Sequence, residues 1–155
     1  HAGYPYSGPI AGSAYKNLMK LAADIRRVVL LGPSHYIPVE GVAASSAQYF
    51  ETPLGKVEID ADFAQKLIAV NPKIYFKESA HLEEHSLEVQ LPFLQKTLQD
   101  FRVVPIILGN QNGSADILID ALKNLIDENT LIVVSTDLSH YPDYNRLPGK
   151  QVNQV

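Results

Sequence analysis

The stretch VVLLGPSH at residues 28–35 decides the fold class of this chain. Its four consecutive apolar residues are long enough for a strand that is buried on both faces, and the Gly-Pro pair ends that strand. A similar apolar run returns at residues 102–108 and again at 131–134, with helical apolar spacing at 114–126 between them. We therefore predict an α/β fold in which helices flank a largely parallel central sheet.

The segments around these strands predict further elements. Helical spacing favours a helix over residues 7–25, with Ser7 as its cap and Pro9 at the first helical position. The remaining predicted elements are short strands or a hairpin at 42–44, 49–52 and 57–59, a helix over 60–70 ended by Asn71-Pro72, and a helix over 86–98 that Pro92 kinks or divides. We expect residues 1–147 to form one domain and the polar residues 148–155 to form a flexible tail.

Composition narrows the classes of function. The 155 residues, 46% of them hydrophobic, suit one globular domain. Thirteen Lys and Arg against seventeen Asp and Glu give a net charge of −4 without a basic block, so we expect no nucleic-acid partner. The apolar runs are too short to cross a membrane, so we expect no membrane partner. No cysteine is present, so any metal ion here needs His, Asp, Glu or backbone oxygen as ligands.

The first residue carries a further expectation. The chain begins at His1 without a methionine or a signal-like segment ahead of it. We expect it to be part of a longer, cytoplasmic protein, and the sheet to be incomplete within these residues.

Histidines follow two of the predicted strands. His35 comes after the strand at 28–31, and His140 comes after the strand at 131–134. Because ligands of open α/β sheets bind where parallel strands end, we expect both rings to face one crevice. His1 reaches the same edge if a strand precedes it, and His81 and His85 lie on either side of an acidic pair.

Two histidines and a carboxylate are the groups that hold non-haem iron(II), and they also suit copper or zinc. The structural alternative is that each histidine is an ordinary hydrogen-bonded loop residue. For His85 that alternative is concrete, because Glu84-His85-Ser86 has the form of a helix cap. Both interpretations are open at this point.

Four motifs of this chain resemble the Memo family, named for a mediator of cell motility. The motifs are HAGY at 1–4, LGPSH at 31–35, EHSLE at 84–88 and STDLSHY at 135–141. The resemblance implies a fold similar to class III extradiol ring-cleavage dioxygenases, with a metal pocket at the strand ends. It also implies that His1 and His35 are metal ligands and that Asp137 and His140 line the same pocket. Family members run on beyond this length, and a further ligand, a cysteine in the animal proteins, has no counterpart here.

The first functional hypothesis is a metal-dependent oxidoreductase related to extradiol dioxygenases. Iron or copper is the expected ion, with zinc as the third choice, and a small molecule is the expected substrate. His140, positioned by Asp137, is expected to move protons, so that both are catalytic residues. The alternative for these two residues is that they bind the ion. We expect Glu84 and His85 to surround the ligands without binding the ion themselves.

Three alternatives accompany this hypothesis. The family's link to phosphotyrosine peptides favours a peptide-binding signalling module that uses the same pocket, with four tyrosines nearby, namely Tyr4, Tyr6, Tyr36 and Tyr141. A Ser/His hydrolase built on Ser34 or Ser135 ranks lower, because neither serine lies in a Gly-x-Ser-x-Gly elbow. Copper chelation by the amine and ring of His1 ranks lowest, because the enzymes that use it are β-sandwiches.

Overall fold

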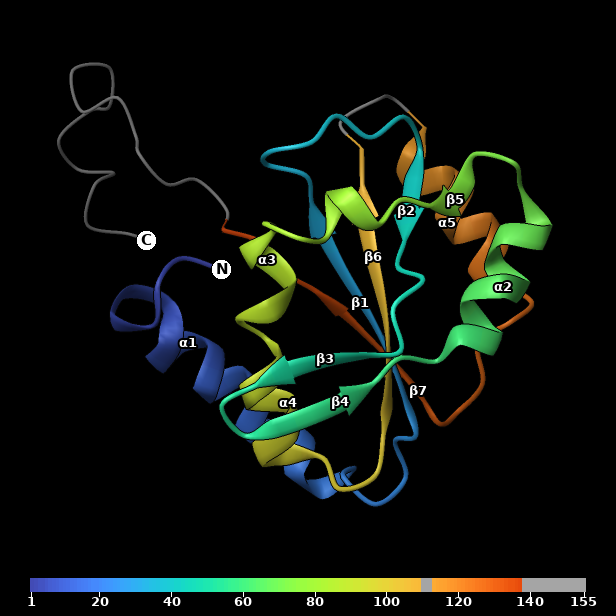
Figure 1. The fold of residues 1–155 in the computed structure, drawn as a ribbon. Helices are drawn as coiled ribbons and strands as arrows, with labels where there is room; N and C mark the ends of the chain where they lie inside the picture. Colours follow the sequence, from blue (N-terminus) through green and yellow to red (C-terminus); the bar gives the residue numbers. More distant parts are fainter. Residues whose placement is uncertain (110–112, 138–155) are drawn as a thin grey trace, which may run out of the picture.

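The computed structural model describes residues 1–109 and 113–137 of the chain. Figure 1 shows a central sheet with helices on both sides and a separate two-stranded hairpin packed across one face. The predicted tail at 148–155 lies outside the described residues, as does His140. Among the described helices, none combines the length and the apolar character that crossing a membrane requires.

The described part of the sheet has five strands in the order β5-β2-β6-β1-β7. Strand β1 (Arg27–Pro33) lies between β6 (Arg102–Leu108) and β7 (Thr130–Val134) and is parallel to both. Strand β2 (Val42–Ala44) runs antiparallel to β6 and parallel to β5 (Ile74–Phe76). The predicted α/β class with a mostly parallel central sheet is confirmed, and the carboxyl ends of β1, β6 and β7 share one edge.

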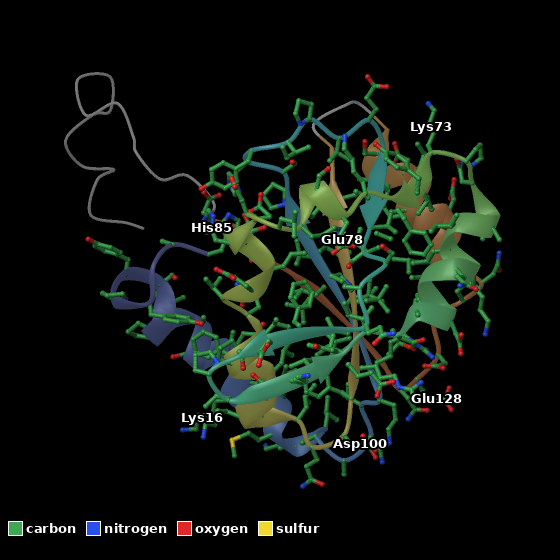
Figure 2. The ribbon with its side chains drawn as sticks, viewed as in Figure 1. Lys16, Lys73, Glu78, His85, Asp100 and Glu128 are labelled. Carbon is green, nitrogen blue, oxygen red and sulfur yellow. The ribbon has the colours of Figure 1, made fainter. Side chains whose placement is uncertain are left out.

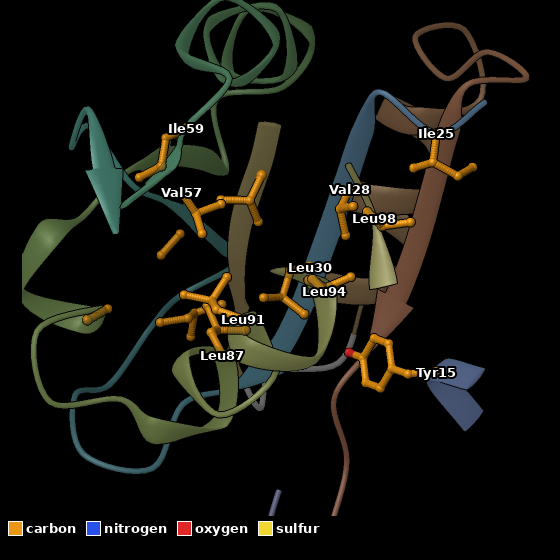
Figure 3. Close-up of a cluster of buried hydrophobic side chains, with 14 of the residues drawn as sticks. Tyr15, Ile25, Val28, Leu30, Val57, Ile59, Leu87, Leu91, Leu94 and Leu98 are labelled. Atoms are coloured by element: carbon orange, nitrogen blue, oxygen red, sulfur yellow. The ribbon is translucent and has the colours of Figure 1, made fainter. Parts of the chain in front are cut away.

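The two faces of the sheet bury two separate apolar clusters, which explains why β1 is apolar without alternation. Val28 and Leu30 face one cluster, whereas Val29 and Leu31 face the other. Figure 3 shows the first cluster, in which Leu30 lies among leucines of the covering helices. Because both faces are covered, each of these four residues contributes apolar burial.

Helices cover both faces. Helix α1 (Tyr4–Lys16), α3 (His85–Glu88) and α4 (Leu91–Thr97) lie on one side of the sheet in Figure 1, and α2 (Ala61–Val70) and α5 (Ser114–Leu122) lie on the other. The smaller elements are the 3₁₀ turns η1 (Asn17–Lys20) and η2 (Glu78–Ala80) and the hairpin strands β3 (Tyr49–Thr52) and β4 (Gly55–Glu58). Asp60 caps α2, because its side chain accepts a hydrogen bond from Phe63 N.

The predicted start of the first helix was wrong. Helix α1 begins at Tyr4, with Pro5 in the first turn, where a missing N–H costs nothing. Ser7 does not cap the helix; its hydroxyl donates to the carbonyl of Ala2. Pro9 lies inside the helix on its exposed side.

Two predicted helices end early and one is divided. Regular α-helix stops at Lys16 rather than near residue 25, and α5 stops at Leu122 rather than at 126. The predicted helix at 86–98 is divided into α3 and α4, with Pro92 in the first turn of α4. The division leaves α3 as a single turn whose first residue, His85, lies at the carboxyl edge of the sheet.

Candidate metal centre

Three imidazole rings gather where β1 ends. His35 follows β1, His85 opens α3, and His1 lies directly before α1. The ring centroids are 5.2 Å apart for His1 and His35, 5.6 Å for His1 and His85, and 5.0 Å for His35 and His85. Each ring offers a nitrogen that lies within 4.8 Å of the other two, a spacing that a shared metal ion can close. Figure 2 shows His85 at this end of α3, near the start of the chain.

The Glu84 carboxylate contacts two of these rings and also accepts hydrogen bonds from two backbone N–H groups. It lies 2.8 Å from His35 Nδ1, accepts a hydrogen bond from His35 N, also at 2.8 Å, and caps α3 by accepting from Ser86 N. The same carboxylate lies 3.8 Å from His85 Nδ1. With His35 Nδ1 held by Glu84, His35 Nε2 is left as the nitrogen that can bind an ion.

The negative charge of Glu84 is stabilised by hydrogen bonds, although the side chain is buried and only 2% exposed. Burial raises the pKa of this carboxyl, but hydrogen bonds from His35 and Ser86 outweigh burial and the net pKa is lowered. A carboxylate beside the imidazoles of His35 and His85 favours the binding of a cation.

His1 is buried, with 5% of its surface exposed. Its Nδ1 lies 3.1 Å from Ser135 Oγ, whereas its Nε2 finds no hydrogen-bond partner within residues 1–109 and 113–137. The carboxylate of Asp137 lies 3.7 Å from this Nε2. A buried nitrogen that lies beside a carboxylate, on a ring that belongs to a group of three imidazoles, is suited to a metal ion.

A surface depression adjoins the cluster. The loop at residues 34–40 lines it, with a volume of about 370 Å³. Tyr36 in this loop is 58% exposed, and its ring centroid lies 6.3 Å from that of His35 and 6.4 Å from that of His85. A small molecule held in the depression would therefore lie beside His35.

The structure brings most of the predicted site residues together. His1 and His35, expected as ligands, lie beside one another, Asp137 adjoins His1, and the Glu84 carboxylate contacts His35. His85 was expected only around the ligands, yet its ring lies within the cluster itself. His140 falls outside the described residues, so its catalytic role stays a prediction.

Sequence reasoning missed Gln90 and the contacts of Ser135. Gln90 lies between α3 and α4, among apolar positions, and it is only 8% exposed. A polar residue at such a position was the only signal, because its partners are distant in sequence.

The hydrolase alternative gains no support from the two serines. Ser34 Oγ donates its proton to the carbonyl of Ile37, and Ser135 Oγ donates to the carbonyl of Ser86. A nucleophilic serine instead directs its proton at an imidazole base.

His81 lies apart from the cluster in a buried position, with 6% of its surface exposed. Burial lowers the pKa of His81 below its ordinary value of 6.5, although the Glu78 carboxylate and the backbone of Ala44 and Ala43 oppose this effect. His81 is therefore neutral in the folded protein at neutral pH.

This burial predicts a pH-dependent loss of stability. Below about pH 6.5 the unfolded chain protonates His81 while the folded chain does not, so the free energy of unfolding falls as the pH falls toward the folded pKa. His81→Leu removes this titration. Urea unfolding at about pH 8 and about pH 5.5 should therefore show a smaller loss of stability in the variant than in the wild type. Equal losses would contradict a buried neutral His81.

Comparison with known proteins places this chain among relatives of the same kind. The family described as "Memo-like protein" matches residues 1–151. A MEMO1 family protein of Saccharolobus islandicus strain Y.G.57.14 is 38% identical over 162 residues, which cover 100% of this chain and 56% of the relative. A MEMO1 family protein of Methanopyrus kandleri is 37% identical over 156 residues, which cover 97% of this chain and 54% of the relative. The chain thus spans about half the length of these curated relatives, and it belongs to the Memo-like protein family.

Proposed function

We propose that this chain binds one divalent metal ion through His1, His35 and His85. The observation that carries the proposal is the buried Nε2 of His1, which has no hydrogen-bond partner in the described residues and belongs to a three-imidazole group. A buried polar atom without a partner costs free energy, and no hydrogen bond in the described residues offsets that cost for His1 Nε2. A bound metal ion would offset it.

The donor set favours iron or copper, with zinc as the third candidate. Neutral imidazoles suit all three ions, and the Asp137 carboxylate beside His1 adds the oxygen donor typical of non-haem iron(II) sites. Glu84 and Asp137 supply negative charge near the three rings, which offsets the charge of a cation. Such an ion, when bound, supplies Lewis acidity and, for iron or copper, redox chemistry.

The chain's own residues define what such a centre would do. His35 is held in orientation by Glu84, and His1 is held by Ser135, so both rings are fixed before a ligand arrives. Where the three imidazoles alone hold the ion, Asp137 lies where it can exchange a proton with a molecule near His1. The depression at 34–40 offers room for a small molecule beside His35, and we propose an oxidoreductase acting on such a molecule.

Metal loading tests the proposal directly. The protein should take up about one ion per chain from iron(II) under anaerobic conditions, from copper(II) or from zinc, as measured by elemental analysis after desalting. Its unfolding temperature should rise with ion concentration, because an ion that binds only the folded state stabilises it. No retained ion and no temperature shift with any of the three would overturn the proposal. Oxygen added to the iron-loaded protein with a panel of catechols would then test for ring cleavage.

The exposed ring of Tyr36 favours a second candidate, a peptide-binding module that uses the same depression. Aromatic side chains at a surface depression are common anchors for peptides. Titration with tyrosine phosphopeptides separates the two functions. Binding that is unaffected by the metal, together with no turnover of catechols, would favour the module.

A further inference from the structure

A chain of buried hydrogen bonds runs from α1 to His1. The hydroxyl of Tyr15 donates to Gln90 Oε1 at 2.9 Å, Gln90 Nε2 donates to Ser135 Oγ at 2.9 Å, and Ser135 Oγ lies 3.1 Å from His1 Nδ1. All four residues are buried, with exposures between 4% for Ser135 and 8% for Gln90. The members are distant in sequence, so the contacts depend on the folded sheet.

The direction of each bond follows from one obligatory acceptor. Ser135 Oγ lies 2.6 Å from the carbonyl oxygen of Ser86, and a carbonyl oxygen can only accept. The single hydroxyl proton of Ser135 is therefore committed to Ser86. Every other neighbour of Ser135 Oγ must then donate to it, which requires an N–H from both Gln90 and His1.

The bond between Gln90 and Tyr15, at the other end of this series of hydrogen bonds, agrees with this direction. With its amide N–H turned to Ser135, Gln90 presents its oxygen to Tyr15, which must donate. Burial raises the pKa of the Tyr15 hydroxyl, so it keeps the proton that this bond needs.

We infer that Ser135 is a positioning residue that fixes the tautomer of His1. The ring carries its proton on Nδ1, which leaves the lone pair on Nε2, the nitrogen that lies 3.7 Å from Asp137 on a ring of the three-imidazole group. This inference rests on the proposed metal site, since a lone pair on Nε2 is what an ion would bind there. Ser135 prepares one ligand in the correct form before the ion arrives, which lowers the cost of binding.

The location of the carboxylate supports the assignment. Asp137 Oδ2 lies 3.7 Å from His1 Nε2, beyond the range of a good hydrogen bond. A lone pair and a carboxylate repel each other at this distance, and a cation between them would attract both. Ser135 sets this arrangement because it holds the proton of His1 on Nδ1.

The tautomer can be measured without a metal ion. In metal-free protein carrying ¹⁵N-labelled histidine, a long-range proton–nitrogen spectrum at about pH 8 should show His1 neutral with its proton on Nδ1. Loss of the assigned signals in His1→Gln identifies the ring. A proton on Nε2, or a doubly protonated ring, would overturn the inference.

Two variants then test whether Ser135 is the cause. Ser135→Ala should let the Nε2–H tautomer appear and should weaken zinc binding by about tenfold to a hundredfold. Ser45→Ala removes another buried serine hydroxyl, which bonds to Glu78, and should leave both readouts unchanged.

The outcomes separate the two proposals. Wild-type protein that binds no ion overturns the metal site, while its spectrum still tests the tautomer. Wild-type protein that binds zinc no more tightly than Ser135→Ala, with the same tautomer in both, overturns the role of Ser135. If Ser135→Ala does not fold, as judged by circular dichroism, the wild-type spectrum alone decides.

Discussion

His35→Ala should weaken metal binding by at least about a hundredfold. Four-ligand zinc sites contribute roughly 10–16 kcal/mol of binding free energy, or about 3 kcal/mol for each ligand, which corresponds to about a hundredfold in affinity. The fold should tolerate the change, because the His35 side chain is 32% exposed and its backbone N–H still donates to Glu84. Competition with a chromophoric chelator gives the affinity, and urea unfolding gives the stability.

Neighbouring variants show whether the loss is specific. Tyr36→Phe keeps an aromatic ring next to His35 and should bind the ion as the wild type does. His85→Ala distinguishes a ligand from a surrounding residue. Loss of a ligand should weaken binding at least as much as His35→Ala does, whereas loss of a supporting contact costs about tenfold to a hundredfold. Unchanged affinity in His35→Ala would contradict its assignment as a ligand.

The sheet was predictable because its strands are apolar on both faces. The runs that form β1 and β6 have no alternation, which only a sheet covered on two sides explains. The antiparallel pairing of β2 with β6 was not predictable, because three apolar residues carry no signal of direction.

The site was predictable only as far as each histidine followed a strand. His35 follows β1, so its place at the carboxyl edge came from local sequence. His85 opens α3, and no local pattern in the sequence shows that its ring lies 5.6 Å from that of His1. The bonds of Ser135 to Gln90 and His1 span 45 and 134 residues, and no local pattern predicts them.

Gly109→Ala should strongly destabilise the protein, because the added methyl group has the shortest contact of any glycine position in the described residues. A Cβ built on Gly109 would lie 1.9 Å from the carbonyl oxygen of Val39 and 2.8 Å from its carbonyl carbon, so two backbone segments must separate by more than about 1 Å. The separation strains the core and weakens the bond from Gly109 N to Gly41 O, which is 2.9 Å long. Overpacking and the lost hydrogen bond together should cost about 3 kcal/mol, or a fall of about 10 °C in unfolding temperature.

Gly12→Ala is the matched control for this substitution. Its Cβ would lie 3.8 Å from Phe93 Cε1, an ordinary contact, and alanine favours the helix that contains it, so stability should rise by about 0.5–1 kcal/mol. Because Val39 and His35 belong to the same loop at residues 34–40, displacement of this loop in Gly109→Ala should also weaken metal binding. Calorimetry and chelator competition on both variants measure the two effects. Equal unfolding temperatures for Gly109→Ala and the wild type would show that the strand end and the loop are not in the contact described.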